Sequence, residues 1–297
     1  MFSRRHPYLH FMLFFSSIVS VSAIVISLIV VMGIKYSTQD DISDAEEKVG
    51  IVEVKGYIAD TQDTIQDIRR YREDKSVKAI VIRIDSPGGG VGPSQEISRE
   101  IQRTLQDKKV IASLGAVAAS GGYYIASAAS GIVANPGTIT GSIGVIMGFT
   151  DIQGLLQKIG VTPVVVKSGE YKDIGSPVRT MTDTERTLLQ TFSDQVHRQF
   201  ITAIAEGRHI EHEKVASVAD GRILTGENAH ELGLVDRLGN LEDAIAWAGE
   251  MGGITGKVSA VYAKDKKYTF IKRLAESSLH EIMSQLSAYR LFAGYVL

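Results

Sequence analysis

The order of strand-like and helix-like segments is the feature that most limits what this chain can fold into. Short runs rich in Val and Ile predict strands at 49–56, 80–84, 109–114 and 162–167. Helical patterns predict helices near 60–73, 93–107, 120–130 and 151–159. A longer helix is expected from 182 to 206 and a last strand at 257–262. Strands that alternate with helices at this spacing predict an α/β domain with a largely parallel sheet.

An uncharged apolar segment precedes this domain, from Phe11 to Gly33. About 20 such residues span a bilayer as a helix, whereas a cleaved signal peptide has an apolar segment of only about 7–15 residues. We therefore expect a retained single-pass anchor at 11–34. Arg4 and Arg5 precede it and acidic residues follow it, so the positive-inside rule leaves the N-terminus in the cytoplasm. The domain would then lie outside the cell (inner) membrane, in a periplasm or at the cell exterior.

Composition completes the expected organisation of the chain. Around the anchor we expect a cytoplasmic N-terminus (1–10), a juxtamembrane linker (35–48), a main domain (49–262) and an amphipathic tail (263–297).

The net charge is only −2 and basic residues do not cluster, which argues against a nucleic-acid surface. The chain has no cysteine, which excludes disulfides, thiolate zinc sites and a cysteine nucleophile.

Three glycine-rich loops follow predicted strands or open helices, where parallel α/β folds place their sites. Their sequences are Asp85-Ser-Pro-Gly-Gly-Gly, Ala118-Ala-Ser-Gly-Gly-Tyr-Tyr and Thr140-Gly-Ser-Ile-Gly. The first loop matches neither glycine spacing of the phosphate-binding motifs. A loop that presents backbone N–H groups to an oxyanion is the better use of these glycines.

Ser120 stands between small residues at the start of a predicted helix, where its hydroxyl is open to attack a substrate. On its own this pattern is weak, because Ala-Ser-Gly-Gly also serves as a packing or capping element. It also departs from the G-x-S-x-G elbow, because Ala118 replaces the first glycine.

The general base is the deciding question for Ser120. The histidines are His6, His10, His197, His209, His212, His230 and His280, so none lies between 11 and 196, where the glycine loops are. His197, His209 and His212 have charged, helical surroundings that favour surface positions, and no carboxylate–histidine set predicts a metal site. A buried lysine with a depressed pKa is the natural alternative base.

The ordered motifs resemble the signal peptide peptidase A family in its short form. The resemblance adds Lys167-Ser-Gly-Glu-Tyr-Lys-Asp-Ile-Gly-Ser-Pro, Asp220-Gly-Arg-Ile and Ala229-His-Glu-Leu-Gly-Leu-Val-Asp-Arg-Leu-Gly to the three loops. It covers roughly 48–250, and the set in this order is far more specific than any one motif. It implies the Clp protease/crotonase-like fold of stacked β-β-α units, preceded here by one N-terminal transmembrane helix.

Carried over by position, the resemblance makes Ser120 the nucleophile and Lys172 the general base. Ser142 would orient the lysine, and the backbone N–H groups of Gly88 and Gly121 would form the oxyanion hole. Lys172 also lies in a glycine-bounded loop, whereas Lys167 ends a predicted strand and is expected to point to solvent. No metal or cofactor is implied.

The resemblance further implies a homo-oligomer, expected to be an octamer, whose Ser–Lys dyads are shared between neighbouring protomers. The expected substrates are released signal peptides and other unfolded apolar segments beside the lipid bilayer. Two other classes stay open: a non-catalytic membrane-tethered scaffold of the same fold, and a crotonase-type acyl-CoA enzyme. Ser and Lys at both matching positions argue against the first, and an extracytoplasmic location argues against the second.

Overall fold

The computed structural model describes residues 47–263 without a break, and isolated positions between Tyr8 and Ile24. The chain divides into two compact units, Met1–Glu46 and Glu47–Leu297, and the fold described here belongs to the second. Among the described residues, no helix has both the length and the apolar character that a bilayer crossing requires. The expected anchor (11–34), linker (35–48) and tail (263–297) fall outside the described residues, apart from isolated or edge positions.

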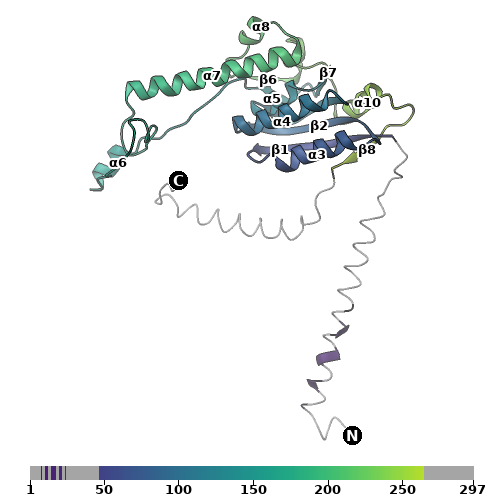
Figure 1. The fold of residues 1–297 in the computed structure, drawn as a ribbon, viewed down its shortest axis with the longest axis horizontal. Coiled ribbons are helices and arrows are strands. Elements are labelled where there is room, and N and C mark those ends of the chain that lie inside the picture. Colours follow the sequence, from purple (N-terminus) through teal and green to yellow (C-terminus); the bar gives the residue numbers. More distant parts are fainter. Residues whose placement is uncertain are drawn as a thin grey trace. The chain divides into compact units, whose positions relative to one another are not determined.

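A mixed sheet forms the centre of this unit (Figure 1). Its strands are β1 (Lys48–Ile58), β2 (Val77–Gly89), β3 (Lys109–Ala119), β4 (Gly131–Ala134), β5 (Ile139–Gly141), β6 (Ile223–Thr225), β7 (Arg237–Leu238) and β8 (Ser259–Tyr262). The main order is β6-β5-β3-β2-β1-β8, with β4 paired to both β3 and β7. All these pairs are parallel except β5 with β6, so the predicted, largely parallel α/β sheet is confirmed.

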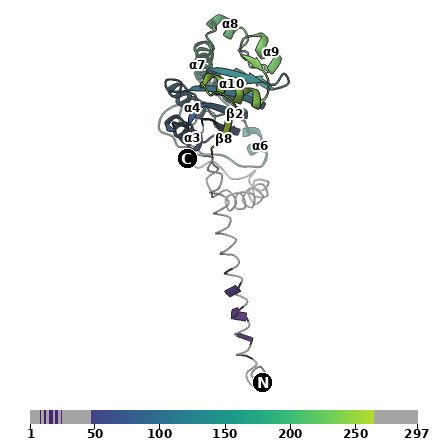
Figure 2. The same cartoon turned by 90° about the vertical axis from the view of Figure 1, so that its right-hand side faces the viewer.

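Alternate residues of β2 enter two different cores because successive side chains point to opposite faces of a sheet. Ile80, Ile82 and Ile84 belong to the larger core, together with apolar residues of helices α3 (Gln62–Glu73), α4 (Val91–Thr104) and α5 (Gly121–Ser127). Ala79 and Val81 face the smaller core, which α10 (Leu241–Met251) covers. The fold therefore has a helical layer on each face of the sheet (Figures 1 and 2).

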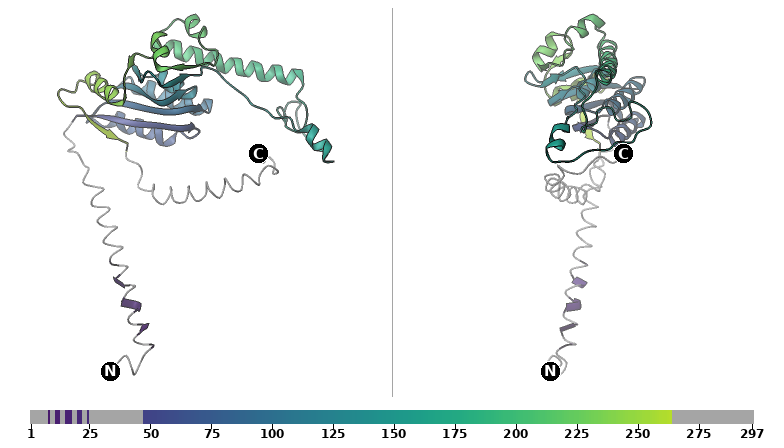
Figure 3. Two further views of the ribbon diagram at one scale, coloured as in Figure 1. Left: turned by 180° about the vertical axis from the view of Figure 1, so that it is seen from behind. Right: turned by 90° about the vertical axis from the view of Figure 1, so that its left-hand side faces the viewer.

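The remaining helices follow the strand β5 in the chain. They are α6 (Gln153–Lys158), α7 (Asp183–Arg208), α8 (His212–Ala216) and α9 (Gly226–Glu231). The C-terminal half of α7 packs on the larger core through Phe200, Ile201 and Ile204. Its N-terminal half runs on beyond the edge of the sheet, where α6 lies (Figure 3).

The predicted strand at 162–167 is wrong. These residues form no strand and pair with no other strand among the described residues. Val164 and Val166 are 85% and 96% exposed, so the apolar run that imitates a buried strand has no protein surface against it. We call residues 145–182, which connect the core to α7 and include this segment, the arm.

Candidate active site

Parallel pairing of β3 with β5 brings two of the predicted site residues together. The register pairs Ala118 with Thr140 and Ala119 with Gly141. Thr140 Oγ1 also donates a hydrogen bond to the Ala118 carbonyl at 2.7 Å, which fixes this register. Ser120 and Ser142 follow directly on the two strands and therefore leave the same edge of the sheet.

Ser120 has an unusual backbone at the junction of β3 and α5. Its φ is 51° and its ψ is −119°, a left-handed region that residues other than glycine rarely adopt. Two hydrogen bonds hold this conformation: the Ser120 N–H donates to the Gly141 carbonyl, and its carbonyl accepts from the Tyr124 N–H, each at 2.9 Å. Strained residues of this kind gather at functional sites, where the surrounding structure maintains them.

Gly88 and Gly121 meet beside Ser120. A Cβ added at Gly88 would lie 2.9 Å from the Gly121 nitrogen and 2.9 Å from Ser120 Cβ, and the φ of Gly88 is +111°. Only glycine fits such a position. The Gly88 N–H itself donates to Ser86 Oγ at 3.0 Å, so in this conformation the hydroxyl of Ser86 occupies one of the two predicted oxyanion-hole donors.

A cavity of about 680 Å³ opens in front of Ser120. The predicted residues on its wall are Gly88, Ser120, Gly121 and Ser142. A second cavity, of about 510 Å³, shares Val145, Ile146, Gln190 and Ser193 with the first. Together the two cavities extend from Ser120 along α7 to both ends of the arm.

His197 is partly exposed and lies on the wall of the Ser120 cavity. Its Nε2 is buried and has no hydrogen-bond partner among the described residues. The reason is its place on α7, three residues before the buried Phe200, because residues three apart share a helix face. Asp194, three residues before His197, shares this face and also lies on the cavity wall.

Lys172 is the one predicted site residue that the cavity wall does not include. It is exposed in a turn of the arm, bounded by Gly169 and Gly175. Lys167 is exposed, as we expected, and its Nζ binds Asp173 Oδ1 at 2.5 Å and the Glu170 carbonyl at 2.7 Å. Within the second unit, the structure therefore brings together every predicted site residue except the lysine.

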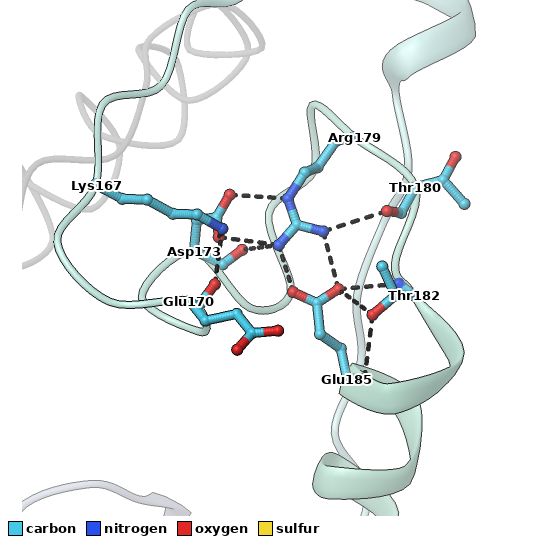
Figure 4. A network of polar contacts seen from close by, with 7 residues as sticks. All are labelled: Lys167, Glu170, Asp173, Arg179, Thr180, Thr182 and Glu185. Atoms are coloured by element: carbon cyan, nitrogen blue, oxygen red, sulfur yellow. Dashed lines mark hydrogen bonds and ion pairs between the residues drawn. The ribbon is translucent and has the colours of Figure 1, made fainter.

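A compact ionic network holds the turn that carries Lys172 (Figure 4). Arg179 binds Asp173 through Nε and Nη2, at 2.8 and 2.9 Å, and binds Glu185 Oε2 through Nη1 at 2.9 Å. Arg179, followed by Lys167, lowers the pKa of Asp173 well below its usual range. Arg179, together with the backbone N–H of Thr182, lowers the pKa of Glu185 to about 2. Both carboxylates therefore stay charged at neutral pH.

Sequence reasoning did not find His197 or Arg179 as parts of this region. The helix period of α7 places His197 on one face with Phe200, but no pattern shows that this face borders a cavity. Arg179 belongs to a polar loop whose partners lie six residues away on either side. Among the described residues, no group of three or more His, Asp or Glu side chains is arranged to hold a metal ion.

Comparisons with known proteins identify the family. A family profile described as "Peptidase family S49" matches residues 102–255. A putative protease of Synechocystis is 46% identical over 213 residues, which cover 71% of this chain and 77% of that protein. A putative signal peptide peptidase SppA of Enterococcus faecium is 37% identical over 68% of this chain and 62% of its own length.

A solved structure shares the fold. It is a mutant of the 1510-N membrane-bound stomatin-specific protease, with a TM-score of 0.50 and 20% sequence identity. The match covers 75% of this chain and all of that one. At this identity the likeness concerns the fold alone. The family profile and the curated relatives carry the assignment: the chain belongs to peptidase family S49 and is a peptidase.

Proposed function

We propose that the chain is a membrane-anchored serine endopeptidase with a Ser–Lys dyad, and that Ser120 is its nucleophile. One observation carries the proposal: a strained Ser120 opens onto a cavity whose wall also includes Ser142 and the glycine pair Gly88 and Gly121. A nucleophile, an orienting hydroxyl and backbone donors on one wall are the parts that acyl transfer needs. Family S49 membership supports the same reaction class.

The proposed reaction is hydrolysis through an acyl-enzyme. Neutral Lys172 takes the proton from Ser120 Oγ, which attacks a peptide carbonyl whose oxygen is held by the N–H groups of Gly88 and Gly121. The Gly88 N–H must then exchange Ser86 Oγ for the substrate oxygen. The protonated lysine gives its proton to the leaving amine, and water hydrolyses the ester. Ser142 orients the lysine Nζ in both its neutral and its protonated form.

We further propose that a neighbouring protomer supplies Lys172. The lysine is exposed on the arm and absent from the cavity wall of its own chain. The arm also exposes Ile146, Val164 and Val166, each at least 85% accessible, which is unusual for a surface facing only water. A second copy of the chain packed on this segment would cover these side chains, and an octamer of the Clp protease/crotonase-like fold is the assembly we expect.

The substrates we propose are extended apolar peptides, among them released signal peptides at the outer face of the cell (inner) membrane. The joined cavities along α7 support this, because they offer a long path lined by Val145 and Ile146. The Enterococcus relative carries the name of such a peptidase. A scaffold without activity would have no need for the strained Ser120, and an acyl-CoA enzyme would not explain the family match.

Labelling with a fluorescent fluorophosphonate tests the proposed function. We expect the full-length chain in detergent to be labelled, and Ser120→Ala and Lys172→Ala to lose labelling. His197→Gln should keep it, because His197 is the other titratable side chain that sequence reasoning weighed as a base and that lines the cavity. If His197→Gln loses labelling and Lys172→Ala keeps it, the base is His197, and the site is a serine–histidine pair within one chain.

A further inference from the structure

The turn of Lys172 is fixed from one side by a single guanidinium group. Besides its carboxylate bonds to Asp173, Arg179 donates from Nη2 to the Asp173 carbonyl at 3.2 Å. Three contacts with one residue hold both the side chain and the backbone of the position that follows Lys172. Bidentate guanidinium–carboxylate pairs are stiff because two parallel hydrogen bonds fix their geometry.

The same guanidinium ties this turn to α7. Glu185 accepts from Arg179 and also from the Thr182 N–H at 2.9 Å, as the third helical residue of a capping box. Its side chain is 4% exposed, so it is a firm attachment point. The turn of Lys172 therefore takes its position from the first turn of α7, the helix whose later turns line the Ser120 cavity.

Charge balance is the second property of this network. Two carboxylates, Asp173 and Glu185, face two cations, Arg179 and Lys167. Asp173 is the nearest anion in sequence to Lys172, and an unbalanced carboxylate there would favour the protonated lysine. A protonated lysine cannot accept the proton of Ser120. The network thus holds the turn in place and balances the charge of Asp173, the anion next to the base.

Several other charged or titratable residues belong to the arm and to the first turn of α7. They are Asp151, Lys158, Lys167, Glu170, Tyr171, Asp173, Arg179, Asp183, Glu185 and Arg186. Glu170 raises the pKa of Tyr171 above its usual value. Asp151 accepts from Thr180 Oγ1 at 3.2 Å and lies on the cavity wall with Arg186.

We propose that Arg179 is a positioning residue for the reaction: it anchors the Lys172 turn to α7 and cancels the charge of Asp173, so that Lys172 is held in place for Ser120 of the neighbouring protomer. This inference rests on the proposed function, since it assumes that Lys172 is the base. It adds a residue that lies outside the Ser120 cavity, on the wall of the second cavity.

The experiment measures the rate of fluorophosphonate labelling of the full-length chain between pH 6 and 10. Arg179→Met should move the rising limb of the pH profile upward by about one pH unit, because a net negative charge remains beside the lysine. Asp173→Asn should move it downward, and the double variant Arg179→Met/Asp173→Asn should return it toward the wild-type position. Arg103→Met, which breaks an arginine–glutamate pair on α4, is the matched control and should leave the limb unchanged.

Opposite shifts from the two single variants distinguish charge from structure. If Arg179 and Asp173 had only a structural role, both single variants would be labelled more slowly at every pH, and the pH of the rising limb would not change. The double variant would not recover the wild-type rate. That result would overturn the proposal. If Arg179→Met fails to fold, the downward shift in Asp173→Asn decides alone. If Lys172→Ala is labelled at the wild-type rate, both the assignment of Lys172 as base and this inference are wrong. If labelling depends on Lys172 but the pH of the rising limb is the same in all variants, only this inference is wrong.

Discussion

Ser120 combines a proposed chemical role with a backbone conformation that disfavours any side chain. At φ 51° and ψ −119° the expected strain is on the order of 1–3 kcal/mol for a residue other than glycine. Ser120→Gly removes that strain but frees the unfolded chain, so we expect the free energy of unfolding to rise by about 1 kcal/mol. Ser120→Ala, the matched control, keeps the strain and should leave it nearly unchanged. Urea denaturation of both inactive variants checks this; equal stabilities would mean that Ser120 is not strained.

Gly88 tests the close approach beside the nucleophile. Gly88→Ala places a methyl group 2.9 Å from the Gly121 nitrogen, so both predicted oxyanion donors must move. Loss of one such donor lowers the rate by about 10²–10³-fold, and we expect a loss of peptide hydrolysis in that range. Gly92→Ala is the control, because a Cβ there meets nothing within 4 Å. Comparable activity of the two variants would remove Gly88 from the site.

Individual residues were predictable from the sequence where a motif fixes both the residue type and its backbone. Ser120, Gly88, Gly121 and Ser142 stand in glycine loops whose strands pair directly, so the sheet register alone brings them together. His197 was not predictable because its position depends on which face of α7 meets the cavity. That choice is made by packing between distant segments, which no local pattern records.

At the scale of elements, the start of α7 should be sensitive to acid. The folded-state pKa of Glu185 is about 2, below the unfolded value of about 4.3, so the stabilisation is complete above pH 5. It is lost as the pH falls from about 5 toward 2, because the unfolded chain binds the proton first. We expect the melting temperature of the wild type to fall more steeply over this range than that of Glu185→Gln. Circular dichroism measures it, and parallel curves would contradict the prediction.

Elements were predicted well where the apolar pattern matches a buried sheet and badly where it does not. The strands at 49–56, 80–84 and 109–114 became β1, β2 and β3, each buried on both faces. The run Val164-Val-Val has the same composition but remains exposed and unpaired among the described residues. An apolar composition predicts that a segment is buried, but it does not predict which surface covers it. In the proposed assembly, another copy of the chain would cover residues 164–166.

At the scale of the whole molecule, we propose a dyad shared between protomers, and two inactive variants can test this by complementation. In co-assembled Ser120→Ala and Lys172→Ala chains, a site works only where an intact Ser120 meets an intact Lys172 from its neighbour. With equal amounts and random assembly, about one quarter of the sites satisfy this condition in a closed ring. We therefore expect mixed oligomers to recover about a quarter of the wild-type peptide hydrolysis, while each variant alone is inactive.

The control for this experiment is proof of mixing, for which differently tagged chains are purified through both tags in sequence. Doubly purified oligomers that stay inactive would place Ser120 and Lys172 of one chain in the same site, and the arm would then have to fold back onto its own cavity. Recovery above the background would explain why the arm exposes Val164 and Val166 together with the lysine: the apolar contact that joins two copies would also carry the base into the neighbouring site. Assembly and activity would then fail together in Val164→Asp, and hydrolysis would disappear in step with the loss of oligomers in size-exclusion chromatography.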